Sequence, residues 1–256
     1  MFVEADGNSL HYTSYGEGPP VLFIHGLGGS ANVWHGVMQA MQQHHHVIAL
    51  DLRGHGRSQG RGKFSVDMWV KDVQKLLSSL ELSAVSVVGH SLGTLVAQQL
   101  AVKSPDLVDS LVLVGGISYF SPETAKAYDQ RADAVEKDGL DDIVDGWLAG
   151  AISPQSHATQ AGMAGLLREL ILRNDPVSYA KSCRALAQMP QIRRDEIGQP
   201  TLVITGAYDR STPLGMAEEL ATSIPVCRVR VLADVGHWVP LEAPGPLAAT
   251  ILEFLT

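Results

Sequence analysis

Cysteine is nearly absent from this chain, which has only Cys183 and Cys227 among 256 residues. This scarcity excludes a disulfide framework, and the pair also lacks the C-x-x-C spacing of many redox and metal sites. A free cysteine usually behaves as a small hydrophobe, so we expect both side chains to be buried.

Basic residues and long apolar runs are scarce as well. The chain has 19 Lys and Arg against 27 Asp and Glu, a formal charge of −8. Nucleic-acid affinity depends largely on cations that neutralise phosphates, so this balance argues against a nucleic-acid partner. No window reaches about 18 uninterrupted apolar residues, and the first residues carry no signal-peptide run. We expect a cytoplasmic protein with no nucleic-acid or membrane partner, and the sequence leaves its oligomeric state open.

Two conspicuous stretches do not predict a metal or cofactor site. The histidines at 44–46 are consecutive, so their side chains point in different directions, and no H-E-x-x-H is present. The HGLGG stretch at 25–29 lacks both the lysine of a P-loop and the spacing G-x-G-x-x-G. We therefore expect no metal and no cofactor.

Short apolar runs recur along the chain and predict strands. They are VLFI at 21–24, VIAL at 47–50, VSVV at 85–88, LVLV at 111–114, TLVI at 201–204 and VRVL at 229–232. Continuous runs suit strands buried on both faces of a parallel sheet. Segments of helical periodicity separate them, as in residues 64–80. The pattern predicts an α/β fold, a mostly parallel sheet flanked by helices, with an N-terminal hairpin that turns at Asp6-Gly7.

The alternation of strands and helices stops between Ser118 and about Glu196. Four helices are predicted there, around residues 122–138, 140–152, 158–173 and 176–189. We interpret residues 118–196 as a helical cap, or lid, inserted into a core made of residues 1–117 and 197–256.

Two stretches match G-x-S-x-G, and their surroundings differ. GHSLG at 89–93 follows the VSVV strand directly and opens an apolar helix. That is the setting of a nucleophile elbow, a sharp turn that exposes a serine hydroxyl above the sheet. GRSQG at 56–60 has neither a strand directly before it nor a helix after it. Ser91 is the predicted nucleophile, and Ser58 is predicted to be a loop residue.

A serine hydroxyl is a weak nucleophile and needs a base, normally histidine, together with an acid that orients the base. Only His157 and His237 follow Ser91, and His157 lies in the predicted cap. His237 comes just after a predicted strand, at the sheet edge where the elbow opens, so it is the predicted base. Asp209, which also follows a strand, is the predicted acid, and Asp234 is the alternative.

Backbone amides are predicted to bind the oxyanion that develops during acyl transfer. The Leu92 amide lies at the N-terminus of the helix after the serine, and the Leu27 amide lies in the glycine-rich loop. Trp147 and Leu166 in the cap, with Trp238 beside the predicted base, are candidate substrate-binding residues. The cap arginines at 131, 168, 173 and 184 could pair with a substrate carboxylate, although arginine on a helix usually faces solvent.

Five motifs in order, HGLGGSANVW, DLRGHGRS, GHSLG, GAYDRSTP and DVGHW, resemble the α/β-hydrolase superfamily across residues 1–117 and 197–256. The loop D-x-R-G-H-G-x-S recurs in that family and does not carry its nucleophile, which again favours Ser91 over Ser58. The length and the helical cap are similar to those of 3-oxoadipate enol-lactonases and related small esterases.

The resemblance implies a serine hydrolase that cleaves a small carboxylic ester or lactone through an acyl-enzyme, with Ser91, His237 and Asp209 as a catalytic triad. Three alternatives remain open at this point. The stretch GHWVPLEAP is also similar to carbon–carbon bond hydrolases of the meta-cleavage type. A cofactor-free perhydrolase and a small-molecule receptor that keeps the triad are the others.

Overall fold

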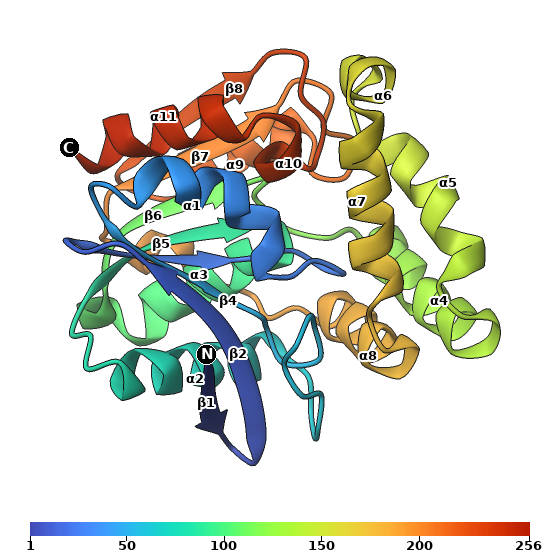
Figure 1. The fold of residues 1–256 in the computed structure, drawn as a ribbon, viewed down its shortest axis with the longest axis horizontal. Coiled ribbons are helices and arrows are strands. Elements are labelled where there is room, and N and C mark those ends of the chain that lie inside the picture. Colours follow the sequence, from blue (N-terminus) through green and yellow to red (C-terminus); the bar gives the residue numbers. More distant parts are fainter.

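The computed structural model describes residues 1–256 and contains one sheet of eight strands in the order β1-β2-β4-β3-β5-β6-β7-β8 (Figure 1). The strands are β1 (Phe2–Ala5), β2 (Asn8–Tyr15), β3 (Pro20–Ile24), β4 (His46–Leu50), β5 (Val85–His90), β6 (Val108–Val114), β7 (Thr201–Gly206) and β8 (Cys227–Leu232). Neighbours from β4 through β8 pair in parallel, whereas β1 and β2 form an antiparallel hairpin on β4. The predicted α/β fold class is confirmed.

Helices cover both faces of this sheet (Figure 1). The helices of the core are η1 (Ala31–Trp34), α1 (His35–Met41), α2 (Val66–Ser79), α3 (Leu92–Lys103), η2 (Pro105–Leu107), η3 (Arg194–Glu196), α9 (Leu214–Ser223), α10 (Val239–Glu242) and α11 (Pro244–Leu255). Helix α2 packs on α3 at one face, and α1 packs on α11 at the other. Helix α3 is buried on nearly every side, which explains why its apolar residues are not confined to one stripe.

Five helices lie between β6 and β7 and form a separate layer beside the sheet (Figure 1). They are α4 (Pro122–Asp138), α5 (Asp141–Ala151), α6 (Pro154–Thr159), α7 (Ala161–Leu172) and α8 (Pro176–Ala187). The sequence predicted four helices and missed α6, because the third predicted helix began only at residue 158. Helices α6 and α7 are separate because Gln160 leaves the helical conformation and its side-chain amide donates to the Glu242 carbonyl at 3.1 Å.

The loop after β4 is fixed by buried polar contacts. The Asp51 carboxylate accepts hydrogen bonds from the Ala31 amide at 2.6 Å and the Arg57 amide at 2.9 Å. The Ser58 hydroxyl donates to the Asp51 carbonyl at 2.6 Å and accepts from the His11 amide at 2.8 Å. Both hydrogen-bonding functions of Ser58 are thus used within the loop, which fits its interpretation as a structural residue.

The same loop is tied to α2 by a buried ion pair. Arg53 Nε donates to Asp72 Oδ2 at 2.9 Å, and Arg53 Nη2 donates to Asp72 Oδ1 at 2.6 Å. Both side chains are almost fully buried. Burial raises the pKa of Asp72 despite the guanidinium beside it, so the carboxylate depends on Arg53 to remain charged.

The two cysteines differ in burial, and no helix has the character of a membrane span. Cys183 is buried as expected, but Cys227 at the edge of the sheet is only half-buried, and the two are not bonded to each other. None of the helices is both long enough and apolar enough to span a lipid bilayer.

We predict that Arg53→Met lowers the free energy of unfolding by about 3–5 kcal/mol, because it leaves the Asp72 carboxylate buried without a counterion. Urea denaturation measures the loss. Lys103→Met is the matched control, since Lys103 pairs with Asp67 at the surface and should cost no more than about 1 kcal/mol. Adding Asp72→Leu to Arg53→Met should recover most of the stability. Equal losses at Arg53 and Lys103 would contradict the anchoring role of the buried pair.

Candidate active site

Ser91 occupies a sharp turn between β5 and α3. Its backbone has φ 51° and ψ −117°, a conformation that side-chain-bearing residues rarely adopt. The turn is held by the Ser91 amide, which donates to the Val114 carbonyl at 2.9 Å, and by the Thr94 hydroxyl, which donates to the Ser91 carbonyl at 2.6 Å. A Cβ at Gly89 would overlap the backbone of Gly93, and one at Gly93 would overlap the end of β3. The spacing G-x-S-x-G is therefore a steric requirement of this turn.

His237 and Asp209 approach from the loops after β8 and β7. His237 Nδ1 lies 2.8 Å from Asp209 Oδ2, and both side chains are buried. Asp209 Oδ1 accepts from the Ser211 amide at 2.9 Å and the Thr212 amide at 2.8 Å, while the Thr212 hydroxyl donates to Oδ2 at 2.7 Å. The carboxylate is held rigidly, and it fixes the Nδ1–H tautomer of His237, which leaves Nε2 as the basic nitrogen.

The contacts of Asp209 keep it charged despite its burial. Burial by itself would raise the pKa of this carboxyl, but the charge and hydrogen bond of His237 and the two hydrogen bonds from Thr212 outweigh burial. The pKa of Asp209 is lowered overall. A carboxylate of this kind can stabilise an imidazolium that forms on His237.

Ser91 and His237 line one small cavity of about 20 Å³, at the edge where the parallel strands end. Its walls are Gly26, Leu27, His90, Ser91, Tyr128, Arg131, Trp147, Ser211, His237 and Trp238. The Ser91 hydroxyl and His237 Nε2 make no hydrogen bond with each other in this conformation, a contact that often tightens only in the substrate complex.

The two predicted oxyanion amides flank Ser91. Leu92 is the first residue of α3, where the amide has no carbonyl one turn earlier to bond. The Leu27 amide donates to no other backbone group, and Leu27 lines the cavity. The loop approaches closely, since a Cβ at Gly26 would stand 2.9 Å from the Ser91 Cβ. The two amides are thus available beside the serine.

Three buried histidines near the cavity hold backbone groups. His90 Nε2–H donates to the His237 carbonyl at 2.8 Å. His25 Nδ1–H donates to the Gly26 carbonyl at 2.7 Å, and His25 Nε2 accepts from the Leu52 amide at 3.0 Å. Burial lowers the pKa of His25 to about 4 and the pKa of His90 to about 3. His55 bonds the Arg53 carbonyl at 3.2 Å, and burial lowers its pKa to about 3. All three rings are neutral at pH 7.

The inserted helices are hydrogen-bonded to the loops that carry the site. The His237 amide donates to the Ala151 carbonyl of α5 at 2.8 Å. Asn174, between α7 and α8, donates from Nδ2 to the Gly28 carbonyl at 2.9 Å.

A buried glutamate reinforces this connection. Glu242 accepts from the Gly236 amide at 2.9 Å and the Trp238 amide at 3.1 Å, on either side of His237. It also accepts from the Ser153 amide in the insertion at 3.0 Å. Neither Asn174 nor Glu242 stands in a recognisable motif; the only local signal is the position of Glu242 five residues after His237.

The candidate substrate-binding residues do not all reach the cavity. Trp147 of α5 and Trp238 line it and meet edge to face, with ring centroids 5.8 Å apart. Leu166 does not, because α7 turns Leu167, Leu170 and Ile171 inward and leaves Leu166 47% exposed on another face. The structure thus places Leu166 outside the cavity that Ser91 and His237 line.

The alternative acid and the other cap arginines lie away from the cavity. Asp234 is exposed. Arg168 pairs with Asp145, Arg184 pairs with Asp133 and Glu136, and Arg173 is exposed. Arg131 is the one cap arginine that lines the cavity. Tyr128, which lines it too, was not predicted from the sequence.

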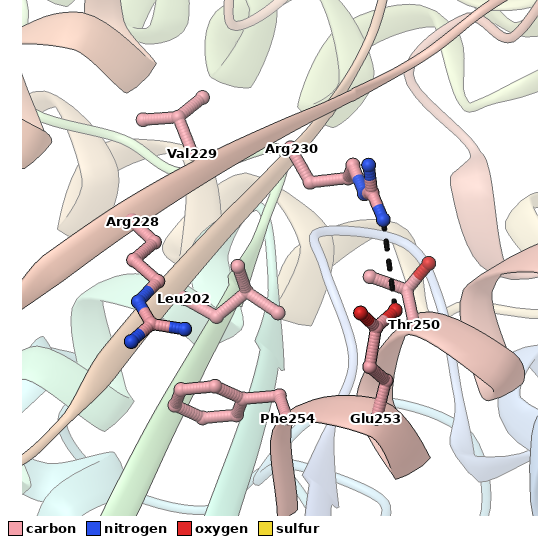
Figure 2. A pocket seen from close by; sticks show the side chains of 7 residues that line it. All are labelled: Leu202, Arg228, Val229, Arg230, Thr250, Glu253 and Phe254. Atoms are coloured by element: carbon pink, nitrogen blue, oxygen red, sulfur yellow. Dashed lines mark ion pairs between the residues drawn. The ribbon is translucent and has the colours of Figure 1, made fainter.

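No group of three or more His, Cys, Asp or Glu side chains has an arrangement that could hold a metal ion. In the histidine run, His46 bonds the Ser14 hydroxyl through Nε2 at 2.7 Å. A further hollow of about 230 Å³ lies between β8 and α11 (Figure 2). Its walls include Arg230 and Glu253, whose charged ends are 3.6 Å apart, and it contains none of the predicted site residues.

Comparisons with known proteins agree with this fold. A family model described as the alpha/beta hydrolase fold matches residues 19–136. The (E)-2-((N-methylformamido)methylene)succinate hydrolase of Acinetobacter baylyi is 30% identical over 94% of this chain and 91% of its own. A thermophilic esterase from Thermogutta terrifontis is 26% identical, with a TM-score of 0.93 over 99% of this chain and 96% of its own. The enol-lactonase of Burkholderia xenovorans LB400 has the same TM-score over 100% of this chain and 99% of its own, but at 24% identity it shows a shared fold alone.

We predict that a fluorophosphonate probe forms a covalent adduct on Ser91, because the strained turn presents its hydroxyl to the cavity that holds His237. Peptide mapping by mass spectrometry locates the adduct. Ser91→Ala should abolish labelling in folded protein. Labelling of Ser58 instead would overturn the assignment.

Proposed function

Since this chain belongs to the α/β-hydrolase family and is a hydrolase, we propose that it cleaves a carboxylic ester or lactone through an acyl-enzyme on Ser91. The observation that carries the proposal is the buried Asp209–His237 hydrogen bond, made by a histidine that shares its cavity with Ser91. The unbonded Leu27 and Leu92 amides beside that serine support it.

Acylation follows from the positions of these groups. The Ser91 oxygen attacks the substrate carbonyl while His237 Nε2 takes the serine proton, and Asp209 stabilises the imidazolium. Negative charge develops on the carbonyl oxygen, where the Leu27 and Leu92 amides donate to it. Loss of one such donor typically costs about 100- to 1000-fold in rate. The intermediate then collapses, and His237 gives its proton to the leaving alkoxide.

Deacylation uses the same groups with water as the nucleophile. His237 removes a proton from water as the water oxygen attacks the acyl carbonyl, and the Ser91 oxygen leaves with that proton. The product is a carboxylic acid. For a lactone, the alcohol and the acid remain on one molecule.

An amide, in which the reacting carbonyl is bonded to nitrogen, is the second candidate substrate class. It is favoured by the relative from Acinetobacter baylyi, which is named for a substrate with a formamide group. The same serine attack applies, but the leaving group is then an amine, which depends more strongly on proton donation from His237. Side-by-side assays of an aryl ester and the matching anilide distinguish the two.

We further propose that the protein acts in the cytoplasm on a small dissolved substrate. The net charge of −8 argues against a polyanionic partner. The two cysteines are unpaired, as is usual for proteins of reducing compartments.

We predict that the wild-type protein turns over 4-nitrophenyl esters many times, and that Asp209→Asn lowers kcat by roughly 10³- to 10⁴-fold. The reason is that an amide at this position favours the wrong tautomer of His237 and cannot stabilise its charge. Release of 4-nitrophenol, followed by absorbance, gives kcat. Asp234→Asn is the matched control, because Asp234 is exposed and should leave kcat within about twofold.

Equal losses in the two variants, at unchanged circular dichroism, would refute Asp209 as the acid. A single slow cycle with wild-type protein would instead favour a receptor. Preferential cleavage of vinylogous diketones would favour a carbon–carbon bond hydrolase.

We predict that Trp147→Ala changes the relative kcat/KM among acyl chain lengths, because Trp147 forms one wall of the cavity. A methylene in an apolar pocket is worth about 1–3 kcal/mol, so shifts of about 10- to 200-fold are expected. Leu166→Ala, an exposed position of the same insertion, is the control and should leave the chain-length profile unchanged. Matching profiles in both variants would exclude Trp147 from the acyl pocket.

A further inference from the structure

Arg131 of α4 is a partly buried cation in the wall of the active-site cavity. It lines the same space as Ser91 and His237. Arginine remains protonated in proteins, so its position places a full positive charge near the reacting groups. Its guanidinium carbon lies 5.3 Å from the ring centre of Tyr128 and 5.9 Å from that of Trp147. These aromatic rings restrict its orientation.

This cation has no carboxylate partner within the protein. Two other arginines of the same insertion do: Arg168 contacts Asp145 at 2.8 Å, and Arg184 contacts Asp133 at 2.7 Å. Arg131 forms no ion pair. A charge that has lost part of its hydration and gained no counterion is costly to keep, which calls for an explanation.

The groups that face Arg131 do not supply a negative charge. Its strongest electrostatic neighbours are the Tyr179 and Tyr128 hydroxyls and the Cys183 thiol. Burial raises the pKa of both tyrosines, and it raises the pKa of Cys183 to about 12, so all three are neutral at pH 7. The arginine therefore stands over aromatic faces, and the Tyr179 hydroxyl, a neutral group, accepts a hydrogen bond from it.

The carboxylates in the surroundings are occupied or lie outside the cavity. Asp209 is the acid nearest the reacting groups, and its oxygens are bonded to Ser211, Thr212 and His237. Glu123 and Asp142 line an outer hollow of about 800 Å³, together with Arg210, and neither pairs with Arg131.

Arg131 also lies at the junction of two spaces. The outer hollow and the inner cavity share the walls formed by Tyr128, Arg131, Trp147 and Ser211. The inner cavity has room for about one water molecule, so a substrate must extend into the outer space or displace these side chains. A molecule that reaches Ser91 from the outer hollow passes the guanidinium.

We propose that Arg131 binds a carboxylate of the substrate, and that the natural substrate is an ester or lactone whose acyl part carries this second, anionic group. This inference rests on the proposed function, because it places the anion in the cavity of Ser91. The guanidinium donates two parallel hydrogen bonds to the carboxylate, and the substrate supplies the counterion that the protein lacks. Hydrolysis then yields a dicarboxylate.

The test compares matched pairs of aryl esters. The anionic members are the 4-nitrophenyl monoesters of glutarate, adipate and pimelate, which vary the distance between the carboxylate and the reacting carbonyl. Each neutral partner carries an isopropyl group in place of the carboxylate. Rates of spontaneous hydrolysis are subtracted. Wild-type protein should prefer the anionic member of at least one pair by about 10- to 100-fold in kcat/KM, as expected for charge-assisted hydrogen bonds.

The variants separate recognition from folding. Arg131→Met should bring the ratio of kcat/KM between the anionic and the neutral member of each pair close to one, so the ratio within a pair, and not the absolute rate, is the readout. Arg131→Lys keeps the charge but loses the two-bond geometry, and it should retain part of the preference. Arg168→Met, in the same insertion but at the surface, should keep the wild-type ratio. The proposal is wrong if wild-type protein prefers no anionic ester, or if Arg131→Met lowers both members of every pair equally.

A binding measurement distinguishes failure of this proposal from failure of the proposed function. Adipate is titrated calorimetrically into Ser91→Ala and into Ser91→Ala with Arg131→Met, neither of which needs turnover. We expect the second protein to bind adipate at least tenfold more weakly. Arg131-dependent binding with no turnover of any ester would refute ester hydrolysis and leave the anion site standing. Turnover without Arg131-dependent binding would refute the anion site alone.

Discussion

The whole site depends on one strained turn. Ser91 takes a positive φ at the end of β5, a conformation that costs on the order of 1–3 kcal/mol and persists only where surrounding structure imposes it. β5 lies between β3 and β6 in the middle of the sheet, and α3 packs directly on it. The glycines on either side let the helix, the neighbouring strand and the turn approach closely. The buried core thus stabilises a geometry that the isolated segment would not keep, and the hydroxyl is presented with little freedom to relax.

The inserted helices contribute more than a wall over this turn. The Ala151 carbonyl accepts from the His237 amide, and Asn174 donates to the Gly28 carbonyl. The Ser153 amide donates to Glu242, whose carboxylate also accepts from the amides on either side of His237. The loops of His237 and Gly28 both carry groups that the proposed mechanism uses. Movement of α5 or of the α7–α8 connection would therefore shift His237 or the Leu27 amide, so the walls of the cavity and the positions of the proposed catalytic groups are mechanically linked.

Much of the fold and the grouping of the site residues could be predicted from local patterns. Five of the six apolar runs are strands buried on both faces, but the run at 229–232 is the exposed edge strand β8, because no further strand covers that side. The glycines around Ser91 reflect a steric need of the turn itself. Asp209 and His237 could be placed because each directly follows a predicted strand. Their catalytic roles stay predictions. Leu166 was misplaced because it stands next to Leu167 on α7, and composition does not tell which of two adjacent apolar residues faces inward.

Other features had no local signal. Glu242 and Asn174 matter because distant backbone groups meet them in the folded chain. The break between α6 and α7 depends on a contact between Gln160 and the Glu242 carbonyl, which no helix propensity encodes. The inference about Arg131 depends on the absence of a carboxylate partner, which becomes visible only when every neighbour is placed.

The three neutral imidazoles that brace the site also make unfolding proton-linked. His25, His55 and His90 have pKa values of about 4, 3 and 3 in the folded chain, against an ordinary value of 6.5 that they regain on unfolding. Their contribution to stability is complete above pH 6.5 and is lost as the pH falls toward 3, because the unfolded chain then binds protons that the folded chain excludes. Each ring weakens the fold by about 1.4 kcal/mol per pH unit across that interval, and three rings act together. Acidification therefore destabilises the loops around the candidate site before it titrates the Asp209 carboxylate.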